Sequence, residues 1–177
     1  MMLVTGGTAS GKSAFAEEKA ADIARSLANK RIIYIATLCD DSAESAEKIK
    51  AHRLAREDLD CETAECFSCE ALDAVSNAGG VVLLDCLATF VADVVFGTCE
   101  AAGDLISHIY DCIARLSERC DCLIVVSDMV FSDGETWTGD MKLYMDTLAG
   151  VLGHTAAAAD AVVEVVCGIP VKIKGEF

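Results

Sequence analysis

The stretch EKIKAHRLAR, residues 47–56, places basic side chains on both sides of a histidine, His52. The 177-residue chain holds only 14 Lys and Arg against 29 Asp and Glu, with a formal net charge of −15. A neutral imidazole is a nucleophile, and cations beside it attract phosphate groups. The stretch is therefore either a solvated helix face or a phosphate-binding, nucleophilic segment. Its cations are Lys48, Lys50, Arg53 and Arg56.

A second segment, GGTASGKS at residues 6–13, matches the phosphate-binding pattern G-x-x-x-x-G-K-[ST] at every fixed position. It follows an apolar strand and opens a predicted helix, which is the context that the pattern requires. Its backbone N–H groups would face the phosphates, while Lys12 would reach the β- and γ-phosphates and Ser13 would bind Mg²⁺. A Gly-rich turn without a ligand is the less favoured alternative. The predicted nucleotide contacts are Gly6, Gly7, Thr8, Ala9, Ser10, Gly11, Lys12 and Ser13.

The acidic partner of such a loop ends a neighbouring apolar strand, close to Mg²⁺ or to a water bound to it. VVLLD ends in Asp85, and CLIVVSD ends in Asp128. We favour Asp85 as the acid and keep Asp128 as the competing candidate.

Short β-branched runs alternate with longer Ala-rich amphipathic segments along the chain, as in α/β folds with a largely parallel sheet. We predict a three-layer, RecA-like P-loop fold in a single domain, residues 1–177, with a C-terminal β-hairpin. The predicted strands are 2–6, 31–37, 81–85, 122–128, 161–168 and 170–174. The predicted helices are 11–28, 42–57, 68–78, 87–96, 101–119 and 140–158, and 131–140 is a predicted loop.

Charge and hydropathy exclude several classes of protein. A net charge of −15 argues against a general nucleic-acid-binding protein. The start lacks the basic and apolar regions of a secretory signal, and Asp85 and Asp93 interrupt the longest apolar run, 81–97. We therefore expect a cytoplasmic protein without a membrane span.

Ten cysteines are many for this length, and without an export signal we expect reduced thiols that serve as small apolar residues. CFSC gives Cys66 and Cys69 a C-x-x-C spacing, but neither a second such pair nor a well-spaced histidine pair follows. His108 and His154 have no comparable context, and we expect structural roles for them.

The motifs together resemble one family, the bifunctional adenosylcobinamide kinase/adenosylcobinamide-phosphate guanylyltransferases of cobalamin biosynthesis. The resemblance runs in order over nearly the whole chain. It is carried by LVTGGTASGKS (3–13), YIAT (34–37), KIKAHRLAR (48–56), TAE (63–65), LLDCLATFVADVVF (83–96), AAAAD (156–160) and GIPVKIK (168–174).

The resemblance implies two reactions. A nucleoside triphosphate, ATP or GTP, phosphorylates the aminopropanol hydroxyl of adenosylcobinamide, and GTP then guanylylates a histidine that passes GMP to the new phosphate. By motif the histidine is His52, with Lys12 also catalytic, and Asp85 and Ser13 hold the metal. The remaining implied nucleotide contacts are Ala36, Thr37, Leu38, Arg53, Leu54, Ala55, Arg56 and Glu65. The resemblance also implies a homo-oligomer, a trimer in the family.

The chain departs from the family pattern in two places. Family members usually carry Pro and Trp around residues 57–62, where this chain has EDLDCE. After strand 122–128 they usually show Asn-Glu-x-Gly and then an Arg-rich helix, where this chain has SDMVFSDGETW and a helix without those arginines. Two alternatives therefore stay open: another small-molecule P-loop kinase without covalent GMP, and a nucleotide-binding regulatory homologue.

Overall fold

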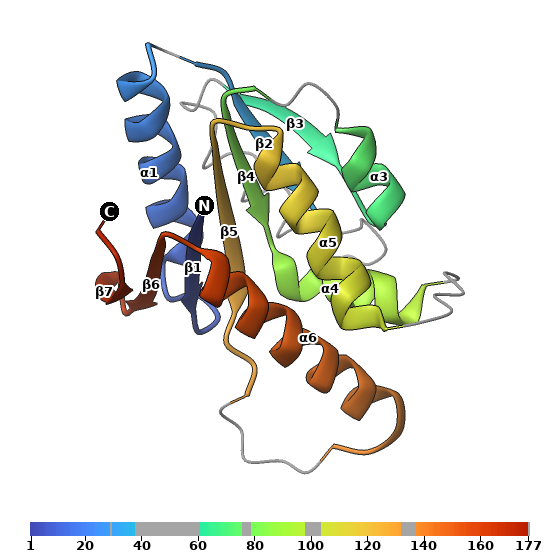
Figure 1. Ribbon diagram of the computed structural model, residues 1–177. Coiled ribbons are helices and arrows are strands. Elements are labelled where there is room, and N and C mark those ends of the chain that lie inside the picture. The colour runs from blue at the N-terminus through green and yellow to red at the C-terminus, as the bar shows by residue number, and fades with distance from the viewer. Residues whose placement is uncertain (29, 38–60, 76–78, 98–103, 132–136, 177) are drawn as a thin grey trace, which may run out of the picture.

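A computed structural model describes residues 1–28, 30–37, 61–75, 79–97, 104–131 and 137–176. Strands and helices alternate along these residues (Figure 1). The strands are β1 (Met2–Gly6), β2 (Ile32–Ala36), β3 (Cys61–Glu65), β4 (Val81–Asp85), β5 (Cys122–Asp128), β6 (Ala161–Val166) and β7 (Ile169–Lys174). The helices are α1 (Lys12–Ser26), α3 (Cys69–Ala74), α4 (Leu87–Phe96), α5 (Leu105–Glu118) and α6 (Gly139–Ala158).

Within these residues the strands form one sheet in the order β3-β2-β4-β5-β1-β6-β7. Every neighbouring pair is parallel except β6 and β7, which form an antiparallel hairpin at the C-terminal end. β5 lies between β1, which leads into the glycine-rich loop, and β4, which ends in Asp85; this is the strand order of RecA-like sheets. The predicted α/β class, parallel sheet and terminal hairpin are confirmed.

The sheet has a buried core on each of its faces, which confirms the three layers. Alternate residues of a strand point to opposite faces, so Met2 and Val4 pack toward α1 while Leu3 packs toward the other side. Small side chains of α1, Ala16, Ala20 and Ala24, form the helix side of the first core. Helices α3, α4, α5 and α6 cover the opposite face (Figure 1).

The predicted elements match the described ones to within a few residues, with one omission. β3 was not predicted, because its sequence CETAE has no apolar run. Among the described strands it pairs only with β2, at the edge of the sheet, and its side chains are exposed or half-buried, so burial imposes little apolar pattern on it. The predicted helix 42–57 lies outside the described residues.

The apolar run 81–97 is strand β4 followed by helix α4, as predicted. Within the described part of the chain, no helix is long and apolar enough to cross a membrane. The eight cysteines there are all free thiols.

Gly80 provides a test of how β4 is positioned at its start. Its φ is +103°, and an added Cβ would lie 2.4 Å from the carbonyl oxygen of Arg31, which already accepts a hydrogen bond from Val81 N. We expect Gly80→Ala to lower the free energy of unfolding by about 2 kcal/mol or more, measured by urea denaturation. In the control Gly79→Ala the added Cβ has open space around it, so the free energy of unfolding should change by no more than about 0.5 kcal/mol. Equal effects of the two substitutions would show that the contact with Arg31 O does not position the start of β4.

Candidate nucleotide-binding site

The register of the parallel strands places the predicted site residues that end strands at the carboxyl edge of the sheet. Gly6 pairs with Asp128 across β1 and β5, and Ala36 pairs with both Asp85 and Glu65 across β2, β4 and β3. These are the last residues of their strands. Ligands of open α/β sheets bind outside this carboxyl edge, so these residues form a candidate ligand-binding site.

The loop between β1 and α1 makes a tight turn that only small residues permit. Ser10 N donates to Gly7 O at 3.1 Å, and both Ala9 and Gly11 have positive φ, +58° and +92°. At Gly6 an added Cβ would lie 2.5 Å from Ser10 Oγ and 2.6 Å from Val165 O. Gly6 is therefore required for the loop to close against β6.

The hairpin turn after β6 supports this loop from the side. Gly168 N donates to Ser10 O at 2.8 Å, and a Cβ on Gly11 would lie 3.4 Å from Gly168 Cα. Cys167 and Gly168 have φ of +50° and +80°, so they form a turn and not the strand end that was predicted for 161–168. This close contact with the loop explains why the first residue of GIPVKIK, Gly168, is a glycine.

The start of α1 has polar groups that an anion would satisfy. Its N-cap, Gly11, supplies no side-chain hydrogen bond, and the first turn has no acidic residue. The first N–H groups of a helix lack intrahelical partners and favour anions. Ser10 Oγ is buried and has no hydrogen-bond partner among the described residues. Together these donors suit a phosphate group.

Lys12 is the cation at this position, and it is 8% exposed. Its Nζ lies 2.5 Å from Asp128 Oδ1 and donates to Gly7 O at 3.2 Å. A buried ammonium group requires such an anionic partner. In this structure the partner is Asp128, the competing candidate for the acidic residue of the loop.

Asp85 has a different partner. It is 9% exposed, and its Oδ2 accepts a hydrogen bond of 2.8 Å from the hydroxyl of Tyr34, which lies on β2. Tyr34 was not predicted as a site residue. Its position in the strand could have indicated it. Tyr34 and Ala36 are two residues apart, so they lie on the same face of β2, and Ala36 pairs with Asp85.

Contacts of Cys86 connect Asp128 to the end of β2. Its Sγ lies 3.9 Å from Asp128 Oδ2. Burial, followed by the negative charge of Asp128, raises the pKa of the Cys86 thiol, so it remains a neutral donor. Cys86 N donates to Thr37 Oγ1 at 2.8 Å, and Thr37 Oγ1 donates to Cys86 O at 2.9 Å. Thr37, fully buried, is thereby fixed beside Asp85.

The other predicted site residues divide into two groups. Ser13 is half-buried at the start of α1, and Thr8 is exposed on the loop. Glu65 is exposed at the end of β3, at the edge of the sheet farthest from β7. Six predicted site residues lie outside the described residues: Leu38, His52, Arg53, Leu54, Ala55 and Arg56.

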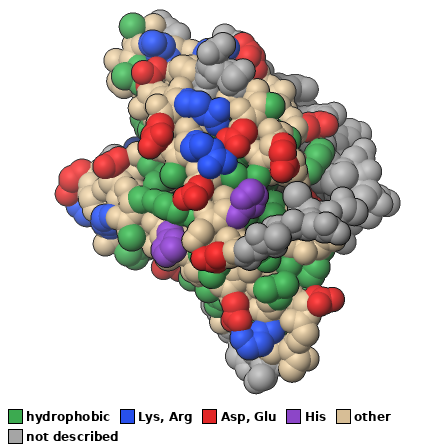
Figure 2. All heavy atoms as spheres, turned by 45° about the vertical axis from the view of Figure 1, so that its right-hand side comes forward, with side chains coloured by type: hydrophobic (Ala, Val, Ile, Leu, Met, Phe, Trp, Pro, Cys, Tyr) green, Lys and Arg blue, Asp and Glu red, His purple; other side chains and the backbone are tan. Residues whose placement is uncertain are grey.

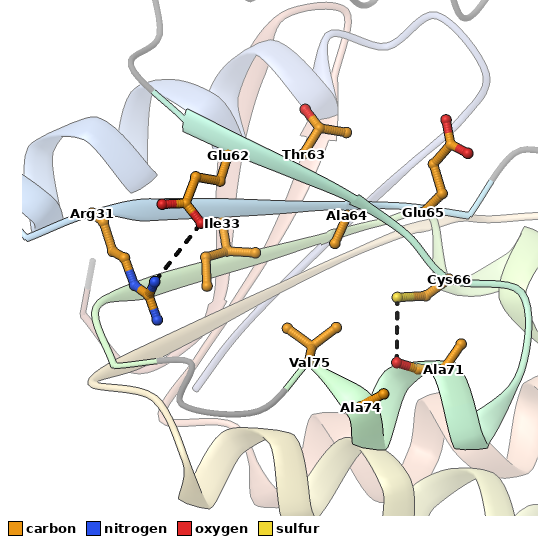
Figure 3. Close-up of a pocket in the computed structure, with 10 residues that line it drawn as sticks. All are labelled: Arg31, Ile33, Glu62, Thr63, Ala64, Glu65, Cys66, Ala71, Ala74 and Val75. Carbon is orange, nitrogen blue, oxygen red and sulfur yellow. Dashed lines mark hydrogen bonds and ion pairs between the residues drawn. The ribbon is translucent and has the colours of Figure 1, made fainter.

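A pocket of about 400 Å³ lies between the β2–β3 edge and α3 (Figure 3). Ile33, Ala64 and Val75 give it an apolar interior, and an Arg31–Glu62 ion pair of 3.7 Å lies at one end. The Glu65 side chain points away from this interior (Figure 3). β2, β4 and β5 separate β3 from β1, so the pocket is distinct from the loop around Lys12.

Comparison with known proteins identifies the family. The model of the family described as cobinamide kinase / cobinamide phosphate guanyltransferase matches residues 2–173. The chain belongs to this family. It is 32% identical over 189 residues to the bifunctional adenosylcobalamin biosynthesis protein CobU of Escherichia coli (strain K12), covering 98% of this chain and 99% of that protein.

Two further proteins are similar. CobU of Salmonella typhimurium, also described as a bifunctional adenosylcobalamin biosynthesis protein, is 31% identical over 191 residues, covering 98% of this chain and 99% of that protein. The crystal structure of the flagellar accessory protein FlaH from Methanocaldococcus jannaschii aligns with 99% of this chain and 78% of its own, with a TM-score of 0.49 and 9% identity.

The Tyr34–Asp85 hydrogen bond gives a prediction for stability. We expect Tyr34→Phe to lower the free energy of unfolding by about 1.5–3 kcal/mol, because a buried carboxylate loses a donor. The matched control is Tyr110→Phe, which keeps the ring against His154 and should have a smaller effect. In an Asp85→Asn background the cost of Tyr34→Phe should fall. An unchanged cost there would show that the Tyr34 hydroxyl does not act through Asp85.

Proposed function

We propose that this protein phosphorylates adenosylcobinamide with a nucleoside triphosphate and then transfers GMP from GTP to the product, giving adenosyl-GDP-cobinamide. The observation that supports this most strongly is the uncapped start of α1 with a buried Lys12, in a chain whose family match spans residues 2–173. Anion-binding geometry indicates phosphate chemistry, and the family indicates the acceptor.

In the first reaction we assign phosphate binding to the loop 6–13 and to Lys12. The acceptor hydroxyl attacks the γ-phosphorus, the bond to the bridging oxygen breaks, and the nucleoside diphosphate leaves while the hydroxyl loses its proton. Lys12 would exchange Asp128 for phosphate oxygens and offset the charge that develops on them.

The donors near Lys12 also suit a magnesium ion, because hydroxyl and carboxylate oxygens are the hard ligands that it prefers. We propose that Ser13 and Asp85 hold it. When bound, the ion would neutralise charge on the β- and γ-phosphates. Asp85 would have one oxygen oriented by Tyr34.

In the second reaction we propose His52 as the nucleophile. A neutral imidazole nitrogen would attack the α-phosphorus of GTP and release pyrophosphate, and the GMP would then pass to the phosphate of the cobinamide, which frees the histidine. Arg53 and Arg56 would hold the polyphosphate. We further propose nucleotide contacts at Ala36, Thr37, Leu38, Leu54, Ala55 and Glu65, and a homo-oligomeric, trimeric assembly.

Covalent labelling tests the role of His52. With α-labelled GTP and Mg²⁺, we expect the wild-type protein to acquire an acid-labile, base-stable label, as a phosphoramidate would. His52→Ala should reduce the label to background, while its cobinamide kinase turnover stays within about threefold, because the two reactions use different groups. His154→Ala, a change at an exposed histidine of α6, serves as the matched control.

Each contrary outcome identifies an alternative. Kinase activity in a wild-type protein that takes up no α-label would indicate a small-molecule kinase without covalent GMP. Tight GTP binding with neither activity would indicate a regulatory nucleotide-binding protein.

Comparison of two isosteric variants decides which acid serves the metal. We expect Asp85→Asn to lose most of the Mg²⁺-dependent gain in affinity for a fluorescent GTP analogue, about tenfold or more, or about 1.4 kcal/mol. Asp128→Asn should keep that gain and bind Mg²⁺-free nucleotide severalfold more tightly, because a carboxylate no longer competes for Lys12. The reverse pattern would assign the metal to Asp128.

A further inference from the structure

A group of metal-ligating side chains lies on the α-helical layer, away from the loop around Lys12. Cys69 begins α3, and His108 and Cys112 lie one turn apart on α5. One ligand atom from each lies within 4.8 Å of the other two. α3 packs against α5 (Figure 1), so the three residues come from segments that are far apart in the sequence.

The two cysteines and the histidine differ in exposure. Cys69 is 3% exposed and Cys112 is fully buried, whereas His108 is exposed. Figure 2 shows histidine side chains at the surface of the molecule among acidic and basic ones. The thiols therefore form the inner side of the group, and the imidazole forms the side that faces solvent.

Arg115 and Asp73 form the polar surroundings of Cys112. Arg115 Nη2 lies 3.0 Å from Cys112 Sγ. Asp73 in turn fixes the guanidinium with two hydrogen bonds, of 3.1 and 2.7 Å. Donors of this kind commonly orient the ligands of metal sites from outside.

We propose that Cys69, His108 and Cys112 bind a zinc ion, or another borderline-soft divalent cation, which joins α3 to α5. Two thiolates would neutralise the charge of the ion, and thiolate with imidazole is a ligand set typical of zinc. Zn–S bonds of about 2.3 Å place sulfurs about 3.8 Å apart in a tetrahedron. The three ligand atoms lie within 4.8 Å of one another, so only small side-chain movements would bring them to these distances. Water would take the fourth position, on the solvent side of His108.

This site would lie in the helix layer, separate from the proposed reactions. α3 follows β3, which pairs with β2 at the edge of the sheet that the described strands form. An ion shared by α3 and α5 would fix the segment after β3 to the helix layer. Because the fold brings the three ligands together, the ion would bind the folded chain more tightly than the unfolded one and would raise stability by mass action.

Metal titration of the full chain tests the proposal. The protein is treated with chelator, kept reduced, and titrated separately with Zn²⁺ and with Co²⁺. We expect one ion per chain, a sulfur-to-cobalt charge-transfer band with visible bands of a tetrahedral site, and a rise of several degrees in the melting temperature with Zn²⁺.

His108→Ala is the decisive variant, because the side chain is exposed and its loss leaves no core cavity. Loss of even an outer partner weakens metal binding ten- to 100-fold, so loss of this ligand should raise the apparent Kd for Co²⁺ by ~100-fold. Cys112→Ser should reduce the charge-transfer band at saturating Co²⁺ to half or less, because one of the two thiolates is lost. The matched controls are His154→Ala and Cys167→Ser, both changes at exposed residues, and they should bind as the wild type does.

Several outcomes would overturn the assignment. If His108→Ala takes up Co²⁺ as the wild type does, the ion belongs to other cysteines. If the reduced protein binds no ion, or if Cys69 and Cys112 only form a disulfide in air, the group is not a metal site. Cys112 is buried, so if Cys112→Ser fails to fold, the His108→Ala result decides alone.

Discussion

The site around the loop 6–13 depends on an electrostatic requirement of one side chain. Lys12 is nearly buried, and an ammonium group removed from water needs an anion nearby. Asp128 supplies it only because β5 lies beside β1 with Gly6 opposite Asp128. The strand order thus fixes where the lysine points, and a phosphate bound there would replace one anion with another. Binding would therefore require Lys12 to exchange the Asp128 carboxylate for a phosphate, and no additional buried charge would have to be paired.

The same requirement explains how a chain of net charge −15 can hold a polyanion. Charges separated by more than about 8–10 Å are largely screened at physiological salt, so the acidic remainder of the surface contributes little repulsion. What matters is local: helix N–H groups without a cap, a first turn without acids, and Lys12. The basic stretch 47–56, which lies outside the described residues, is a second local concentration of positive charge in the sequence.

Much of this could be predicted from the sequence, because strong patterns have direct physical causes. The strands at 2–6 and 81–85 are buried on both faces, so they consist of apolar runs, and a glycine-rich turn before Lys12 is needed for the loop to close. β3 could not be predicted, since an edge strand with exposed side chains carries no such pattern. The Tyr34–Asp85 and Cys69–Cys112 contacts join separate elements, and only the strand and helix pairing reveals them.

The departure from the family pattern at the end of β5 involves a residue that contacts Lys12. Where family members usually carry an Asn-Glu-x-Gly element, this chain ends β5 with Asp128 and continues with Met129. Asp128 contacts both Lys12 and the Cys86 thiol, and Cys86 is fixed to Thr37. The changed segment therefore begins with a carboxylate that contacts both Lys12 and Cys86. The first residue of the departure thus lies within the candidate site, where it supplies the anion that the buried lysine requires.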